Sequence, residues 1–326
     1  MFRFFSRFLV GLSLTVFVAN CNTKLALPRV LHQAVKKESP KIVLITIDGV
    51  RWQEVLNGTD PLLHEGRSIS AEEMLPNIHR YFVERGSAFG KESPVVVSGT
   101  NHISLPGYLE MMRGIPTIDC VTNLCEPQLQ TTLLDYFSKV AVFSSWDTVR
   151  KASTSNPDRI VINTGRDYRS AAYEDLHLKD DHSFDCYVGH FDYRPDEFTM
   201  VSVLDYISHE KPQFLWVSLG DTDEHAHAGN YRGYISALKR ADYYIGDIIQ
   251  SYDDNTIFII TTDHGRSQNW RNHGYDSESS RVWLMIHGSG IPHSGHSRLD
   301  RTVSLSDILP TVLKLTHGIT TKKSFI

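Results

Sequence analysis

The stretch that decides the fold is Thr256–Gly265, which reads TIFIITTDHG. Apolar and β-branched residues lead directly into an aspartate, a histidine and a glycine. A short apolar run of this kind is typical of a strand buried in a parallel sheet. In open α/β sheets, ligands bind just beyond the carboxyl ends of the strands. Asp263 and His264 are therefore predicted to lie at a binding edge.

Similar apolar runs recur along the chain, and helical repeats separate them. Helices are predicted over Phe198–Ile207 and Tyr231–Ile249, with Asn230 as the N-cap of the second. Strands that alternate with helices indicate an α/β fold, a mostly parallel central sheet with helices on both faces. The polar stretches 57–75 and 163–197 are predicted to be loops or a cap. The further predicted strands are Lys41–Ile47, Val140–Phe143, Arg159–Ile162, Phe214–Ser218 and Val282–Ile286.

The composition narrows the class of function. The chain has 326 residues, of which 41% are hydrophobic and 22% charged, as in an ordinary globular protein with a sizeable core. A net charge of -5 without a long basic run argues against nucleic acid as a partner. The 16 histidines stand out, because several lie beside aspartates. This pattern points toward metal ions.

Residues 1–20 are predicted to be an export signal. Arg3 and Arg7 precede an apolar segment, Phe8–Ala19, which is short for a membrane span. The segment ends just before Cys21, as in bacterial lipoprotein signals, where the cysteine carries the lipid. Plain secretion is the alternative. Both imply a location in the periplasm or cell envelope, and lipidation of Cys21 would add a membrane anchor.

After the signal, residues 21–40 are expected to form a tether, and residues 41–326 a single catalytic domain. Cys120 and Cys125 are five positions apart in a loop-like stretch. An oxidising compartment favours a local disulfide between them over a metal site, because no second cysteine pair or nearby histidine completes one. Cys186 would then be a free buried thiol.

Acidic residues follow three of the predicted strands. Asp48 follows the first strand, Asp223 follows Phe214–Ser218 after a short interval, and Asp263 follows Thr256–Thr261. Asp223 and His227 are four residues apart, so one helical turn places them on one face. Asp221 and His225 have the same spacing and are the rival pair. The candidate metal ligands are Asp48, Asp223, His227, Asp263, His264 and His273.

These motifs resemble the alkaline phosphatase superfamily, most of all its nucleotide pyrophosphatase/phosphodiesterase branch. The likeness extends from about Lys41 to the C-terminus and includes the closing segment Ser306–Thr311. It implies an alkaline-phosphatase-like layered sandwich. The motifs that carry it, in family order, are Ile47-Asp48-Gly49, Asp223-Glu224-His225-Ala226-His227, Thr262-Asp263-His264-Gly265 and His273-Gly274.

The resemblance implies a centre with two divalent metal ions. Their ligands are Asp and His side chains, which suit zinc best and manganese as an alternative. A nucleophilic serine, Ser104, would contact one of the metals. By this resemblance one metal is held by Asp223, His227 and His273, and the other by Asp48, Asp263 and His264.

Ser104 fits the nucleophile position of the family because Leu105-Pro106 and Gly114 follow it at the family's spacing. Thr100 is the rival, and a serine that only caps a helix is the alternative without chemistry. By the same resemblance, Asn123 would hydrogen-bond a phosphate oxygen. Otherwise it is an ordinary turn residue.

The implied activity is hydrolysis of a small phosphate ester, preferably a phosphodiester or pyrophosphate, through a phosphoserine. The chain lacks the Cys-x-Pro-x-Arg motif of sulfatases, which argues against sulfate esters. It also lacks an arginine near Ser104 that could hold the dianion of a phosphomonoester, which argues against a monoesterase. A phosphomonoesterase or phospho-group transferase is the alternative enzyme, and a surface lipoprotein that only binds is the alternative of another class. Trp52 and Tyr108 would either stack on a nucleobase or pack in the core.

Overall fold

The computed structural model describes residues 38–127, 130–165 and 192–326. The chain divides into the units Met1–Glu38 and Ser39–Ile326, and the second is described here. The predicted signal, Cys21, Cys186 and most of the polar stretch 163–197 lie outside the described residues. Among the described helices, none combines the length and the apolar character that crossing a membrane requires.

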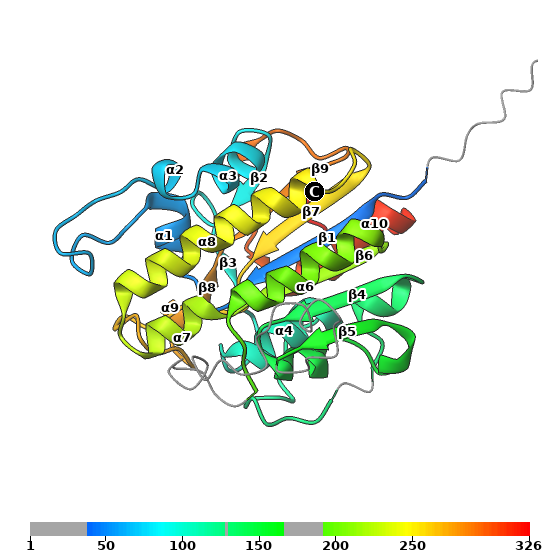
Figure 1. Ribbon diagram of the computed structural model, residues 1–326, viewed down its shortest axis with the longest axis horizontal. Coiled ribbons are helices and arrows are strands. Elements are labelled where there is room, and N and C mark those ends of the chain that lie inside the picture. Colours follow the sequence, from blue (N-terminus) through cyan, green and yellow to red (C-terminus); the bar gives the residue numbers. More distant parts are fainter. Residues whose placement is uncertain (1–37, 128–129, 166–191) are drawn as a thin grey trace, which may run out of the picture. The chain divides into compact units, whose positions relative to one another are not determined.

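A mixed sheet of eight strands forms the centre of this unit (Figure 1). Strand β1 (Lys41–Ile47) lies between β6 (Phe214–Leu219) and β7 (Thr256–Thr261) and is parallel to both. The order is β10-β2-β9-β7-β1-β6-β4-β5. The remaining strands are β2 (Gly86–Phe89), β4 (Val140–Ser144), β5 (Val161–Thr164), β9 (Leu284–Gly288) and β10 (Gly295–His296).

The predicted mostly parallel sheet is confirmed, but two strand assignments differ. The strand predicted over Arg159–Ile162 starts only at Val161 and runs to Thr164, because Arg159 belongs to the 3-10 helix η4 (Pro157–Arg159). The segment Val282–Ile286 is not one parallel strand. It is divided between β8 (Arg281–Val282) and β9, which is antiparallel to β7 and β2. A parallel connection needs a long crossover, usually a helix, but residues 262–280 contain only the short helix α9 (Ser277–Ser280). Strand β8 joins β3 (Val95–Val96) and β11 (Val303–Ser304) in a second, three-stranded sheet.

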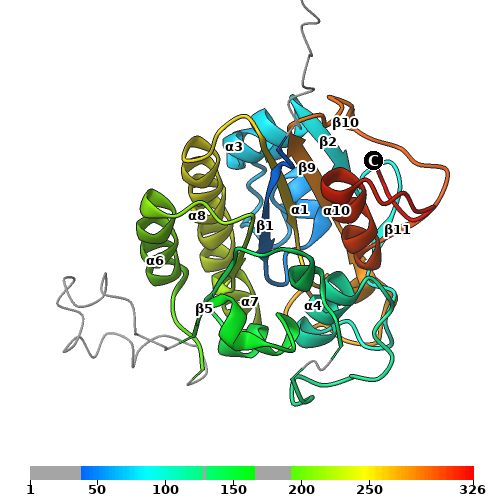
Figure 2. The same ribbon diagram turned by 90° about the vertical axis from the view of Figure 1, so that its right-hand side faces the viewer.

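Helices cover both faces of the sheet, as predicted (Figure 2). Helices α6 (Asp196–His209) and α8 (Tyr231–Gln250) cover one face, and α4 (Ser104–Arg113) and α10 (Ile308–His317) cover the other. Alternate residues of β1 enter two separate apolar cores, because successive side chains of a strand point to opposite faces. The shorter helices are α1 (Trp52–Asn57), α2 (Ala71–Met74), α3 (Pro76–Ile78), α7 (Asp221–His227), η1 (His79–Val83), η2 (Leu133–Tyr136), η3 (Asp147–Ala152), η4 (Pro157–Arg159) and η7 (Leu305–Asp307).

The two predicted long helices are confirmed with small changes at their ends. Asn230 caps α8 as predicted, since its side-chain oxygen accepts a hydrogen bond from the Gly233 N–H at 2.9 Å. The stretch 57–75 is mostly irregular, as predicted, but it ends in α2, where the Ser70 side chain accepts from the Glu73 N–H.

The start of helix α4 lies directly against the end of β7. A Cβ atom at Gly107 would lie 2.1 Å from the carbonyl oxygen of Asp263 and 2.8 Å from its carbonyl carbon. Both are backbone atoms of a buried residue and cannot move aside easily. The absence of a side chain at Gly107 therefore permits the close approach of α4 to Asp263, and Ser104 at the start of this helix lies beside the next residue, His264.

We expect Gly107→Ala to lower the free energy of unfolding by about 1–3 kcal/mol, because the added methyl group overpacks this contact. Gly246→Ala is the matched control. It is also a helical glycine, but its Cβ would meet only the Asn77 side chain, at 2.8 Å, and alanine favours the helix. Urea denaturation measures both variants. Equal stability of the two would contradict the proposed role of Gly107.

Candidate metal centre

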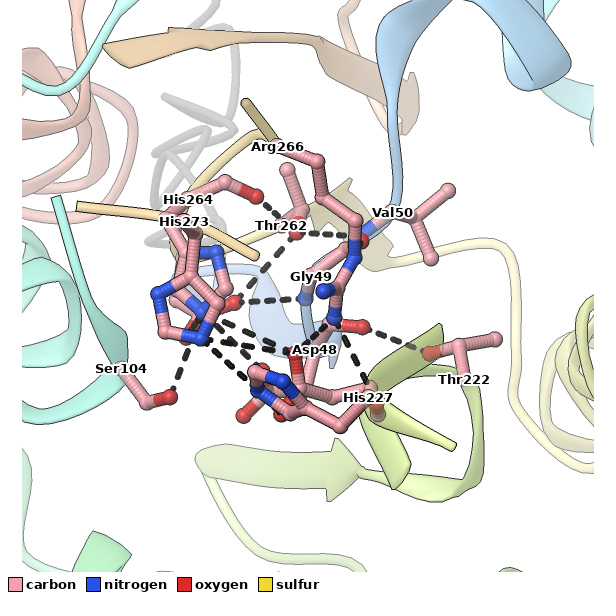
Figure 3. Close-up of polar contacts among 12 residues, drawn as sticks. Asp48, Gly49, Val50, Ser104, Thr222, His227, Thr262, His264, Arg266 and His273 are labelled. Atoms are coloured by element: carbon pink, nitrogen blue, oxygen red, sulfur yellow. Dashed lines mark hydrogen bonds and ion pairs between the residues drawn. The ribbon is translucent and has the colours of Figure 1, made fainter. Parts of the chain in front are cut away.

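Three adjacent strands place carboxylates near their carboxyl ends, and two of these, Asp48 and Asp223, line one cavity. Figure 3 shows Asp48 close to Ser104 and to the rings of His227, His264 and His273. Asp48 follows β1, Asp223 lies in α7 just after β6, and Asp263 follows β7. The cavity has a volume of about 290 Å³. Its lining residues are Asp48, Ser104, Asn123, Trp146, Tyr193, Gly220, Asp223, Glu224, His227, Ala228 and His273.

Gly49 makes the turn that brings these groups together. Its φ of +61° is in the left-handed region, which glycine adopts readily. Its N–H donates to Asp263 Oδ1 at 3.1 Å. A Cβ atom there would lie 2.5 Å from both the Asp223 carboxylate and the Arg266 guanidinium. Glycine is thus required after Asp48 for two reasons, the left-handed backbone conformation and the lack of room for a Cβ atom.

The first ligand cluster consists of Asp48, Asp263 and His264. His264 Nε2 lies 3.3 Å from Asp48 Oδ1 and 3.4 Å from Asp263 Oδ2. One ligand atom from each of the three residues lies within 4.8 Å of the others. His264 Nδ1 lies 2.8 Å from the Gly265 carbonyl oxygen, which suits it as a donor and leaves Nε2 for a metal ion.

The second cluster consists of Asp223, His227 and His273. His227 Nε2 lies 3.2 Å from Asp223 Oδ2 and 3.0 Å from His273 Nε2. His273 Nδ1 lies 3.3 Å from the carbonyl oxygen of His102, so its Nε2 is again the free nitrogen. The two clusters adjoin, because the His264 and His273 rings stack with their centroids 3.8 Å apart.

The donor chemistry of the first cluster fits a bound cation. Among the described residues, Asp48 Oδ1 and Asp263 Oδ2 are buried without a hydrogen-bond donor, an arrangement that is costly unless a cation compensates. Burial, followed by the Asp48 charge, raises the pKa of Asp263 to about 8. Burial opposes charge on His264, but the Asp263 and Asp48 carboxylates prevail and raise its pKa to about 9. These shifts reflect excess negative charge that a divalent ion would neutralise.

In the second cluster, the surroundings of His273 keep its imidazole neutral. Burial and the neighbouring His264 lower the pKa of His273 to about 2. Neutral imidazole is the form that binds a metal ion. For Asp223, burial opposes ionisation, but Arg266 and the histidines outweigh it and hold its pKa well below the usual range.

Arg266 is a site residue that the sequence analysis missed. Its side chain is fully buried and contacts Asp223 Oδ1, while Nε donates to the Gly49 carbonyl at 2.8 Å and Nη1 to the Arg271 carbonyl at 3.1 Å. The guanidinium therefore joins the ends of β1 and β6 to the loop after β7. Its position directly after Asp263-His264-Gly265 was the available signal.

Ser104 lies beside the first cluster. It is the first residue of α4, and its side chain caps nothing, because the N-cap position belongs to Ile103 and has no side-chain bond. Its Oγ lies 3.3 Å from His264 Nε2, and the residue is buried but reaches the cavity. The rival Thr100 is exposed and does not line the cavity in the described part of the chain. The geometry thus favours Ser104.

Asn123 lies next to the start of α4. Its Oδ1 accepts a hydrogen bond from the Leu105 N–H at 3.0 Å, which leaves its amide N–H groups as donors at the cavity. The predicted disulfide between Cys120 and Cys125 is present and encloses this residue.

The rival pair Asp221 and His225 does not line the cavity within the described structure. Asp221 instead accepts hydrogen bonds from the Tyr193 hydroxyl at 2.5 Å and from Arg240 at 3.1 Å. It serves the packing of α7 and not the ligand clusters.

Neither Tyr108 nor Trp52, the two aromatic residues considered for stacking on a nucleobase, is positioned to do so. Tyr108 is fully buried and donates its hydroxyl to Asp48 Oδ2 at 2.8 Å, so it orients a candidate ligand. Trp52 packs against the core and under the Arg281 guanidinium, 4.1 Å from its ring centroid. The spacing of Tyr108, one helical turn after Ser104, could have indicated its position near the site.

Comparison with known sequences supports the resemblance. Residues 181–318 match the model of the Metalloenzyme superfamily. A phosphopentomutase of Alkaliphilus oremlandii (strain OhILAs) is 26% identical over 121 residues, which cover 37% of this chain and 30% of that protein. The human GPI ethanolamine phosphate transferase 1 is 33% identical over 100 residues, which cover 28% of this chain and 11% of that protein. The matches thus span less than a third of these curated relatives.

Solved structures share the fold at low sequence identity. The phosphonate monoester hydrolase of Agrobacterium radiobacter has a TM-score of 0.60 at 14% identity, over 87% of this chain and 78% of that chain. A putative sulfatase from Bacteroides thetaiotaomicron VPI-5482 has a TM-score of 0.59 at 14% identity, over 87% of this chain and 72% of that chain. A Vibrio parahaemolyticus protein of the alkaline phosphatase superfamily has a TM-score of 0.53 at 16% identity, over 86% of this chain and 66% of that chain. The fold is that of this superfamily, and its phosphodiesterase branch is not singled out.

Chelator-treated protein is expected to gain thermal stability when Zn²⁺ is added, because the ion binds the folded state; a concentration 100 times the dissociation constant contributes about 2.7 kcal/mol. His227→Ala should lower the amount of zinc bound per chain, measured by elemental analysis, because it removes one candidate ligand. His225→Ala, two positions away, is the matched control and should bind as much zinc as the unsubstituted protein. Equal zinc content in the two variants would contradict the ligand assignment.

Proposed function

From the alkaline phosphatase superfamily fold of the chain, we propose that it is a metal-dependent hydrolase of phosphate esters, most of all phosphodiesters. The observation that carries this proposal is the position of Ser104 Oγ, 3.3 Å from His264 Nε2, between a ligand cluster and the cavity. The names of the phosphopentomutase, the phosphate transferase and the phosphonate monoester hydrolase, all of which refer to phosphorus groups, support it.

Two divalent ions, best zinc given the His and Asp donors, would be held by Asp48, Asp263 and His264 and by Asp223, His227 and His273. When bound, they would neutralise negative charge on the phosphate and lower the pKa of the attacking oxygen. Tyr108 and Arg266 orient Asp48 and Asp223 through the contacts described above. The ligands are therefore held in place by the protein itself.

The proposed reaction has two displacements at phosphorus. Ser104 Oγ forms a bond to phosphorus as the bond to the leaving oxygen breaks, and the serine proton ends on the departing alcohol. Water then attacks the phosphoserine, its oxygen stays on phosphorus, and a proton returns to Ser104. Asn123 donates its amide N–H to a phosphate oxygen, and the N-terminus of α4, which begins at Ser104, adds favourable backbone dipoles.

A diester is favoured over a monoester by the charges around the cavity. A monoester carries a second negative charge, which enzymes commonly hold with an arginine clamp. No arginine or lysine lines the cavity in the described part of the chain, and Arg266 is buried behind Asp223. The disulfide between Cys120 and Cys125 also supports our proposal that the protein works in an oxidising compartment after export.

Ser104→Ala is expected to lower turnover of a chromogenic phosphodiester by more than about 1,000-fold, because the nucleophile is lost. Its zinc content should be unchanged, since the aspartate and histidine ligands remain. Thr100→Ala is the control and should keep full activity. If Ser104→Ala keeps its activity, Ser104 is not the nucleophile. If the wild-type protein neither binds metal nor turns over the ester, the protein is better explained as a binding module.

Bis(p-nitrophenyl) phosphate is expected to be hydrolysed with at least about a 10-fold higher kcat/KM than p-nitrophenyl phosphate. The reason is that, among the described residues, no lysine or arginine lines the cavity to bind the additional negative charge of the monoester. A tenfold ratio of kcat/KM corresponds to about 1.4 kcal/mol. Release of p-nitrophenol under identical metal and buffer conditions measures both. A preference for the monoester would replace the diesterase by a monoesterase of the same fold.

A further inference from the structure

Two aspartates outside the ligand clusters, Asp196 and Asp221, join the starts of helices α6 and α7. Each is the first residue of its helix, and both side chains are buried. We propose that Asp196 is a positioning residue of the second ligand cluster, because it fixes the start of α7 and thereby holds Asp223 and His227 in place. This inference rests on the proposed metal centre and adds to it a residue outside the six candidate ligands.

Helix α7 begins without a capping side chain of its own. The first N–H groups of a helix have no partner inside it, and a Ser, Thr, Asp or Asn before the first turn commonly supplies one. In α7 that position belongs to Gly220, where a Cβ atom would lie 2.6 Å from a ring carbon of Tyr193. The lack of space excludes a capping side chain there, so the acceptor has to come from elsewhere in the chain.

Asp196 supplies this acceptor from the start of α6. Its Oδ1 accepts a hydrogen bond from the Gly220 N–H at 2.7 Å, and its Oδ2 accepts one from the Asp221 N–H at 3.2 Å. The arrangement is reciprocal, because Asp221 Oδ1 accepts from the Asp196 N–H at 3.1 Å. Pro195, at the N-cap position of α6, has no side-chain acceptor either. The two helix starts therefore cap each other, and the position of α7 is set from α6.

The Asp196 carboxylate is also joined to the central sheet. The Ser145 hydroxyl donates to Asp196 Oδ1 at 2.6 Å, and the Ser145 N–H donates to the Ser218 carbonyl oxygen of β6 at 3.0 Å. Ser145 directly follows β4, which pairs with β6. Hydrogen bonds to a charged carboxylate are short and strong, so these contacts give Asp196 a fixed position relative to two strand ends.

The start of α7 decides where two candidate ligands lie. The Asp223 N–H donates to the Gly220 carbonyl oxygen at 3.0 Å, which closes the first turn. His227 is the last residue of this seven-residue helix, one turn after Asp223. A helix this short has little stability of its own, so its direction depends on what holds its start. Loss of the Asp196 acceptor leaves buried N–H groups unpaired and displaces both ligands together.

The test compares Asp196→Ala with Asp242→Ala. Asp242 is the matched control, because it is also a buried carboxylate that accepts from two backbone N–H groups of another helix, those of Asn77 at 3.2 Å and Ile78 at 2.7 Å. That helix, α3, carries no candidate ligand. Both substitutions remove a cap and should lower the melting temperature. Only Asp196→Ala should weaken zinc binding.

Competition with a chromogenic chelator measures the zinc affinity of each variant. We expect Asp196→Ala to weaken the binding step that His227→Ala impairs by at least about 10-fold, as the loss of a group that orients a metal ligand commonly does. Asp242→Ala should bind zinc as tightly as the wild-type protein. Asp196→Asn keeps the shape and one acceptor oxygen, so its affinity should lie between those of Asp196→Ala and the wild type. It decides the question if Asp196→Ala does not fold.

Amide hydrogen exchange separates this inference from the proposed metal centre. In zinc-free protein, peptides covering residues 220–227 should exchange at least about 10-fold faster in Asp196→Ala than in Asp242→Ala or the wild type, because the start of α7 opens more often. Zinc affinity and exchange that are equal in Asp196→Ala and Asp242→Ala would overturn the role of Asp196 and leave the metal centre. If the wild-type protein binds no zinc, the metal centre is refuted. Faster exchange in Asp196→Ala then still supports the placement of α7 by Asp196, and unchanged exchange overturns it.

Discussion

The structure depends on one electrostatic constraint, the meeting of three aspartates at the ends of three neighbouring parallel strands. Asp48, Asp223 and Asp263 are brought together because β1 lies between β6 and β7, so their carboxyl ends share one edge. Two of their carboxylate oxygens are buried without a donor among the described residues. Such an arrangement persists only if cations compensate it. The surrounding histidines, the arginine and the proposed metal ions follow from this need.

Much of the fold could be predicted because it depends on local patterns. The strand Lys41–Ile47 and the capped helix that follows Asn230 have clear periodicity, and the structure confirms both. The direction of β9 could not be predicted, because an apolar run looks alike in parallel and antiparallel strands. Its direction is decided by the connection before it, which carries His273 and has no room for a crossover helix.

For the site, the sequence indicates residues that follow strands but not those that reach it from elsewhere. Asp48, Asp223 and Asp263 could be found from strand ends. Trp146 and Tyr193 enter the cavity through a β-bridge between distant segments, and no spacing in the sequence signals that contact. Glu224 lies inside a recognised motif, yet its direction toward the cavity depends on where α7 begins.

Arg266 makes the two ligand clusters unequal. It gives Asp223 a permanent countercharge within the protein, through a buried side chain that also holds the Gly49 and Arg271 carbonyls. Asp48 and Asp263 instead have the titratable ring of His264 beside them, with its Nε2 3.3 Å from Asp48 Oδ1 and 3.4 Å from Asp263 Oδ2. Their charges outweigh the effect of burial and raise the pKa of His264 to about 9. Because this ring is titratable whereas the Arg266 guanidinium is a permanent cation, we expect the cluster next to Ser104 to depend more on a bound ion than the cluster at His227. Two buried carboxylate oxygens of this cluster lack a hydrogen-bond donor among the described residues, and an ion that compensates them would lie close to the proposed nucleophile, where it would act on the Ser104 oxygen.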